Sequence, residues 1–160
     1  MNPALLYPPF AQVLGQVAED AHQAKVPLVW TSGHRSWEEQ HTLWLKGRDE
    51  DGHVIYPQLI VTNARPGYSW HNFGMAADFG LQKRAGVLEW STKADLDQDF
   101  VGDWLEVGRI GEGLGLEWGG RWKFLDLPHL QWKSRVNLSD CRKAYLLGGL
   151  SVVWRVVGAA

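Results

Sequence analysis

The segment from Ser69 to Asp78 carries two side chains that can ligate a metal ion. It reads Ser-Trp-His-Asn-Phe-Gly-Met-Ala-Ala-Asp, so His71 and Asp78 lie seven positions apart. Another histidine, His129, follows about fifty residues later within Asp-Leu-Pro-His. Two histidines and one carboxylate can hold a zinc ion and leave one coordination position open. That is the ligand count of a catalytic site rather than a closed structural one.

A second carboxylate and an amide accompany the last of these histidines. Asp126 precedes His129 by three positions, close enough to reach a metal-bound water. Pro128 disfavours helix at Leu127, so we expect this segment to be extended. On an extended chain His129 and Gln131 share one face. Gln131 can therefore hydrogen-bond the imidazole of His129, and metal-bound imidazoles usually require such a partner.

The residues around the first histidine suggest how the ligands come together. The apolar run from Met75 to Phe79 fits a short buried strand, on which Ala76 and Asp78 point to the same face. The small alanine leaves room beside the carboxylate. Gly74 permits the tight backbone entry that brings the preceding histidine back toward Asp78.

The full pattern resembles a known family. Ser-x-His-x-x-Gly-x-Ala-x-Asp at 69–78, followed by Asp-x-x-His at 126–129, looks like the zinc D,D-peptidases. This family includes D-Ala-D-Ala carboxypeptidases and dipeptidases, and the L-alanyl-D-glutamate endopeptidases of phage endolysins. Two further segments are similar to the family's, Thr-Ser-Gly-His-Arg-Ser at 31–36 and Gly-Leu-Glu-Trp-Gly-Gly at 115–120.

The resemblance implies a role for each matching residue. One zinc ion per chain would be held by His71, Asp78 and His129. Asp126 would take a proton from the attacking water and pass it to the leaving amine, and Arg35 would stabilise the oxyanion. Residues expected to contact substrate or support the ligands are Ser69, Trp70, Trp118 and Gln131.

The resemblance also implies a substrate, the stem peptide of bacterial peptidoglycan. The leading interpretation is an L-alanyl-D-glutamate endopeptidase of the endolysin type. One alternative is a D-Ala-D-Ala carboxypeptidase or dipeptidase. Another is a non-catalytic zinc module, because hedgehog signalling domains share this fold and a zinc site yet act by binding partners.

Composition narrows the class of protein. The chain has 160 residues, a net charge of −2 and one cysteine. We expect a single catalytic domain over 1–160 that is monomeric. The charge gives no general basic field for nucleic acid. The sequence predicts no stable membrane insertion and no signal peptide. We therefore expect synthesis in a host cytoplasm and action on the cell wall after release.

Apolar periodicity predicts an α+β fold with a small antiparallel sheet flanked by helices. The resemblance implies that this is the fold of hedgehog domains and D,D-peptidases. Helices are expected over 10–24, 36–46, 97–110 and 138–147, a long loop over 47–66, and a glycine-rich turn over 111–120. Phe100 is a candidate core residue. In the apolar tail, 150–157, we expect Trp154 to pack onto the domain. The alternative is an exposed segment that meets the bacterial envelope.

Overall fold

The computed structural model describes all 160 residues and divides into two compact units. The first unit contains residues 1–33 and 75–133, and the second contains 34–74 and 134–160. The predicted α+β class is confirmed, because helices accompany one small antiparallel sheet. That residues 1–160 act as one domain stays a prediction.

The sheet of the first unit has the strand order β1-β2-β5-β4, with β3 paired to β2, and every pairing is antiparallel. Its strands are β1 (Leu28–Ser32), β2 (Ala76–Arg84), β3 (Val87–Glu89), β4 (Leu116–Trp118) and β5 (His129–Trp132). Met75, Ala76, Ala77 and Phe79 are fully buried, as the apolar run predicted. The central strand β2 thus lies in the core and places Asp78 opposite His129 of β5.

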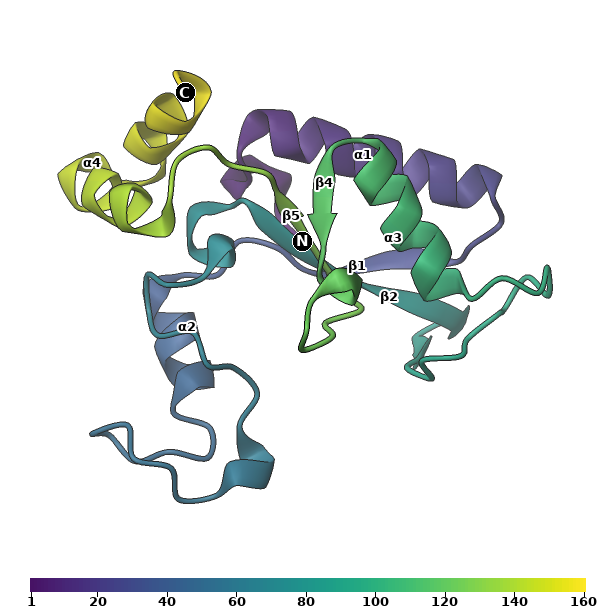
Figure 1. The fold of residues 1–160 in the computed structure, drawn as a ribbon, viewed down its shortest axis with the longest axis horizontal. Helices are drawn as coiled ribbons and strands as arrows, with labels where there is room; N and C mark the ends of the chain where they lie inside the picture. Colours follow the sequence, from purple (N-terminus) through teal and green to yellow (C-terminus); the bar gives the residue numbers. More distant parts are fainter. The chain divides into compact units, whose positions relative to one another are not determined.

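Two helices cover this sheet. Helix α1 (Pro8–Gln23) begins with two prolines, which fit the first turn because that turn needs no N–H donors. Its buried residues recur every three to four positions: Phe10, Leu14, Val17 and Ala21. Helix α3 (Asp103–Gly113) packs against α1 and against β4 (Figure 1).

The predicted start of α3 was wrong. We expected it at residue 97, but α3 begins at Asp103. The Asp95 carboxylate instead accepts the backbone N–H groups of Asp99 and Phe100, each at 3.1 Å, and this ties the preceding residues into a loop. Phe100 is 97% exposed and is not a core residue. The glycine-rich stretch 111–120 also differs from the prediction, because it contains β4.

The second unit is built from helices and one long loop. Helix α2 (Trp37–Trp44) lies within the range expected for a helix, 36–46, and opens with a capping box between Ser36 and Glu39. The stretch 47–66 is irregular apart from a single 3-10 turn, η2 (Pro57–Leu59), and one isolated bridge. A further 3-10 turn, η3 (Trp70–Phe73), ends in Gly74.

The last element, α4 (Leu138–Gly158), bends where Gly148 and Gly149 leave helical geometry, at the break expected from the glycine pair. The part after the break is a helix that packs within its unit. Val153 is fully buried. The Trp154 Nε1–H donates to the Phe73 carbonyl over 2.8 Å. These contacts favour the packing interpretation of the tail over the envelope-contact alternative.

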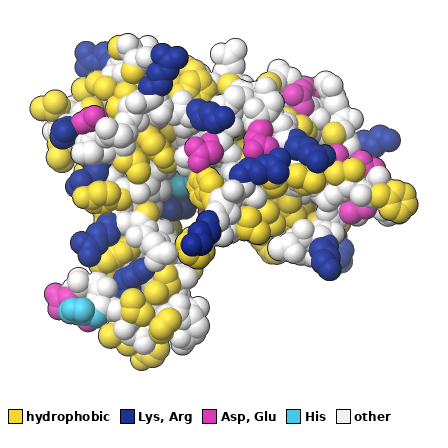
Figure 2. All heavy atoms as spheres, in the orientation of Figure 1, with side chains coloured by type: hydrophobic (Ala, Val, Ile, Leu, Met, Phe, Trp, Pro, Cys, Tyr) yellow, Lys and Arg dark blue, Asp and Glu magenta, His cyan; other side chains and the backbone are white.

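Two further observations concern the surface and the helices. On the face shown in Figure 2, Lys and Arg side chains lie among Asp and Glu side chains, without a continuous basic field. None of the helices combines the length and the apolar character that a bilayer crossing needs.

Trp154→Phe should lower the free energy of unfolding by about 1–2 kcal/mol, because the Phe73 carbonyl loses its donor while most of the ring contact remains. Chemical denaturation would measure the change. The control Leu147→Ala alters a side chain that is 82% exposed and should stay within about 0.5 kcal/mol. Equal effects in both variants would contradict a packed tail.

Candidate metal centre

The three predicted ligands form one group in the structure. His71, Asp78 and His129 each offer a ligand atom, and these atoms all lie within 4.8 Å of one another. Two of the three are fixed by strand pairing, since Asp78 and His129 are register partners. The His129 Nδ1 lies 3.2 Å from Asp78 Oδ1. His71 and His129 are buried, and Asp78 is partly exposed.

The ring of His129 stands between two oxygen acceptors. Its Nδ1 faces the Asp78 carboxylate, and its Nε2 lies 3.0 Å from Gln131 Oε1. Burial lowers the pKa of His129, but the hydrogen bond and charge of Asp78 and the contact with Gln131 outweigh it, so the pKa is raised. A neutral imidazole has only one N–H and can satisfy only one of these acceptors. The second acceptor, the Asp78 carboxylate, can be satisfied only if Nδ1 also carries a proton or binds a metal ion.

A carboxylate that sequence reasoning did not assign to the site decides which way Gln131 faces. Gln131 Nε2 donates to Glu117 Oε2 over 3.2 Å. Because a carboxylate only accepts, the amide nitrogen must face Glu117 and the amide oxygen must face His129. Trp122 Nε1–H donates to the other oxygen of Glu117 over 2.7 Å. This chain of contacts holds the His129 proton on Nε2 and turns Nδ1 toward Asp78.

The third ligand is held by a buried asparagine that the sequence analysis also missed. His71 belongs to η3, and Gly74 closes that turn in the left-handed conformation, with φ of 67°. Asn72 is fully buried. Its Oδ1 accepts the N–H groups of Gly67 and Ser69, at 3.0 and 3.3 Å. Its Nδ2 donates to the Arg35 carbonyl over 2.9 Å. Asn72 thereby joins the turn of His71 to the segment that carries Arg35.

A buried amide also holds the guanidinium of Arg35. Arg35 Nη1 donates to Gln40 Oε1 over 2.9 Å, and Gln40 Nε2 donates to the Ala64 carbonyl over 2.8 Å. Gln40 is fully buried and lies in α2. The Arg35 backbone N–H donates to the His71 carbonyl over 3.0 Å. Side chain and backbone of Arg35 are therefore both held in place.

Asp126 lies on an exposed turn that leads into β5. Its backbone N–H donates to the Gly119 carbonyl, and its carbonyl accepts the N–H of His129, both over 3.1 Å. Gly119 has no room for a side chain, because a β-carbon there would collide with the Asp126 carbonyl and lie 3.2 Å from His129 Cβ. The negative charge of the Asp126 carboxylate contributes to the raised pKa of His129.

The two tryptophans expected near the substrate differ in their surroundings. Trp118 is buried, and its Nε1–H donates to the Leu127 carbonyl over 2.8 Å. It packs between Gly108 and Gly120 and so fixes the segment that precedes Pro128. Trp70 is half-buried in η3.

Comparison with known proteins places this geometry in a family. Residues 62–132 match a family described as D-alanyl-D-alanine carboxypeptidase. The chain is 42% identical over 130 residues to the peptidoglycan L-alanyl-D-glutamate endopeptidase CwlK of Bacillus subtilis (strain 168), which covers 81% of this chain and 74% of that protein.

Solved structures share the fold at lower identity. The L-Ala D-Glu endopeptidase ChiX of Serratia marcescens aligns with a TM-score of 0.53 and 24% identity, over 82% of this chain and 84% of that one. VanYB in complex with D-alanine-D-alanine aligns with a TM-score of 0.55 and 17% identity, over 88% and 77%.

Proposed function

Since this chain belongs to the D-alanyl-D-alanine carboxypeptidase family of peptidases, we propose that it is a zinc-dependent peptidase that cuts the L-alanyl-D-glutamate bond of peptidoglycan stem peptides. The observation that carries this proposal is the group formed by His71, Asp78 and His129 in a chain 42% identical to an enzyme of that name. The proposed role in the cell is that of an endolysin, a monomer that reaches the wall after release.

The donor set fits zinc. Imidazole nitrogen and carboxylate oxygen are ordinary zinc ligands, and three protein ligands leave a position for substrate or water. The fit is strongest at His129, whose Nδ1 faces Asp78 while Nε2 faces Gln131. A cation at Nδ1 would replace the proton that the two facing acceptors otherwise require. The partner on the other ring nitrogen is the arrangement that usually orients a metal-bound histidine.

The chain's own residues carry the remaining chemistry. Bound zinc supplies Lewis-acid activation of a water molecule and of the scissile carbonyl. Asp126 accepts the proton of the attacking water and delivers it to the leaving amine nitrogen. The fixed guanidinium of Arg35 stabilises the negative charge that develops on the carbonyl oxygen. Cys141 takes no part as a nucleophile, because burial raises the pKa of its thiol to about 11.

Two alternatives use the same fold. A D-Ala-D-Ala carboxypeptidase or dipeptidase would differ only in which peptide bond of the substrate lies at the metal centre. A non-catalytic zinc module of the hedgehog kind would not need Asp126 or Arg35, which are both present. The high identity to an endopeptidase favours the first proposal over either of them.

Digestion of purified muropeptides, read by mass spectrometry, tests the proposed reaction. The enzyme should leave L-alanine on the glycan and release a peptide that begins at D-glutamate. A chelator should abolish release and added zinc should restore it. His71→Ala should lose zinc and activity together, whereas the control His53→Ala, at an exposed histidine, should keep both. Release of terminal D-alanine alone would instead identify a carboxypeptidase.

Asp126→Asn separates zinc binding from proton transfer. The variant should keep one zinc per chain by elemental analysis, because Asp126 is assigned to proton transfer and not to coordination. Its kcat should fall by about 10²-fold or more, the usual contribution of a positioned general base. Asp51→Asn, which changes an exposed carboxylate elsewhere, is the control. Near-normal turnover would show that another group moves the proton.

Glu117→Gln should weaken zinc binding by about 10–100-fold, the usual effect of losing a partner behind a metal ligand. With an amide at 117, Gln131 can rotate and no longer fixes the His129 proton on Nε2. Competition with a chelating dye would measure the affinity. The control Glu112→Gln, which loses an ion pair with Arg121 instead, should leave the zinc affinity unchanged.

An exchange of the two side chains sharpens the test. When Glu117→Gln is combined with Gln131→Glu, a carboxylate at position 131 again accepts the N–H of His129. The amide at position 117 then donates to that carboxylate. Zinc affinity should recover in this double variant. Unchanged affinity in Glu117→Gln alone would remove Glu117 from the support of the metal centre.

A further inference from the structure

The loop that precedes α3 carries carboxylates at regular intervals. In the twelve residues 95–106, the first, third, fifth, ninth and twelfth are acidic: Asp95, Asp97, Asp99, Asp103 and Glu106. Calcium-binding loops of the EF-hand type take their oxygen ligands from these same positions, together with a main-chain carbonyl at the seventh. The seventh residue here is Val101.

The fold brings these carboxylates together. Ligand oxygens of Asp95, Asp97 and Asp99 lie within 4.8 Å of one another, and so do those of Asp97, Asp103 and Glu106. Asp97 belongs to both groups, so the two groups form one cluster around it. The two members from α3 stand on its first turns, where the helix begins at the ninth position of the loop.

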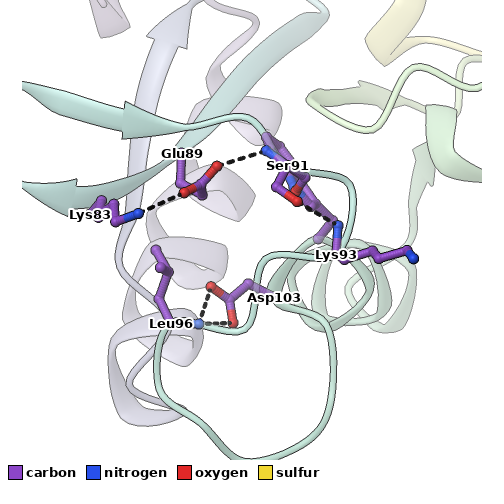
Figure 3. A network of polar contacts seen from close by, with 7 residues as sticks. Lys83, Glu89, Ser91, Lys93, Leu96 and Asp103 are labelled. Carbon is purple, nitrogen blue, oxygen red and sulfur yellow. Dashed lines mark hydrogen bonds and ion pairs between the residues drawn. The ribbon is translucent and has the colours of Figure 1, made fainter.

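One oxygen of this cluster is buried and has no hydrogen-bond partner. It is Oε2 of Glu106. The Glu106 side chain as a whole is half-buried. Buried carboxylate oxygens normally bind a donor or a cation, so an orphaned one within a group of carboxylates indicates a missing ligand. Asp103 is fully buried, and both of its oxygens accept the same N–H, that of Leu96, at 3.2 and 3.1 Å (Figure 3). This single donor leaves lone pairs of Asp103 available for a cation.

The electrostatics of the loop point the same way. Burial first, and then repulsion from Asp99, Asp97 and Asp103, raise the pKa of Glu106 to about 7. The pKa of Asp103 is also raised, by burial and by the neighbouring aspartates. Carboxylates are thus crowded around Glu106, and a divalent cation would offset their mutual repulsion.

We propose that residues 95–106 bind one calcium ion through the carboxylates of Asp95, Asp97, Asp99, Asp103 and Glu106 and the carbonyl of Val101. Calcium suits the set because it accepts six to eight oxygen ligands in flexible geometry, whereas magnesium demands a near-ideal octahedron. This site is separate from the metal centre and does not depend on the proposed peptidase activity.

One position departs from the usual loop. The sixth residue of an EF-hand loop is glycine, because the chain turns sharply there. Here it is Phe100, which adopts the left-handed conformation with φ of 73° and is 97% exposed. The required backbone turn is therefore present, but a non-glycine residue holds it under strain. We expect an affinity at the weak end of such loops, with Kd about 10⁻⁵–10⁻³ M.

Isothermal titration of the zinc-loaded, full-length protein with calcium chloride tests the site. We expect one calcium per chain and a melting temperature that rises with calcium concentration. Magnesium chloride should give at most a small response. The absence of both heat and a melting shift at 10 mM calcium, roughly ten times the weakest expected Kd, would overturn the proposal.

Two variants locate the ion. Glu106→Gln removes a ligand and also relieves repulsion, so without calcium it should melt at or above the wild-type temperature, while its calcium affinity falls about 10-fold or more. Asp99→Asn, at an exposed position, should weaken calcium binding without affecting folding. The control Asp51→Asn lies in another acidic group, with Asp49 and His53, and should keep the full response. Loss of the response in Asp51→Asn, or its retention in the other two variants, would place the ion elsewhere.

Discussion

The pairing of β2 with β5 is the constraint on which the proposed metal centre depends. Side chains alternate between the two faces of a strand, so a slip of one residue would turn either Asp78 or His129 to the opposite face. The register is fixed by the buried residues that flank Asp78, since Ala77 and Phe79 lie in the core. The apolar character of β2 therefore determines the geometry of a polar site, and the free energy that fixes it comes from hydrophobic burial.

Within each of the two units, neutral amides do most of the positioning. Gln131 orients His129, Asn72 joins the turn of His71 to the segment of Arg35, and Gln40 holds the guanidinium. An amide carries both donors and acceptors but no charge, so it can be buried among backbone groups at little electrostatic cost. A charged partner in the place of Gln131 would alter the field at the proposed metal centre.

Local sequence patterns predicted what local physics determines. The helix that starts at 36, the amphipathic α1, the buried strand around Ala77 and the helix expected to end at 147 all depend on neighbours in the chain. The start of α3 could not be found this way, because apolar spacing favoured helix through Phe100 whereas aspartate side chains tie that backbone into a loop. Glu117 and Asn72 were missed for a different reason. Their partners lie 14 and 37 residues away in sequence, and only the fold brings them together.

Gly119 shows how closely folding and chemistry are joined here. Its missing side chain makes room for the Asp126 carbonyl and for His129 Cβ at once. Any larger residue would push on the turn that carries the proposed proton acceptor and on the strand that carries a proposed ligand. A random mutational survey would therefore find no substitution at this position that impairs turnover while leaving the fold intact. The position would be classed as structural, although the turn for which it makes room carries the proposed proton acceptor.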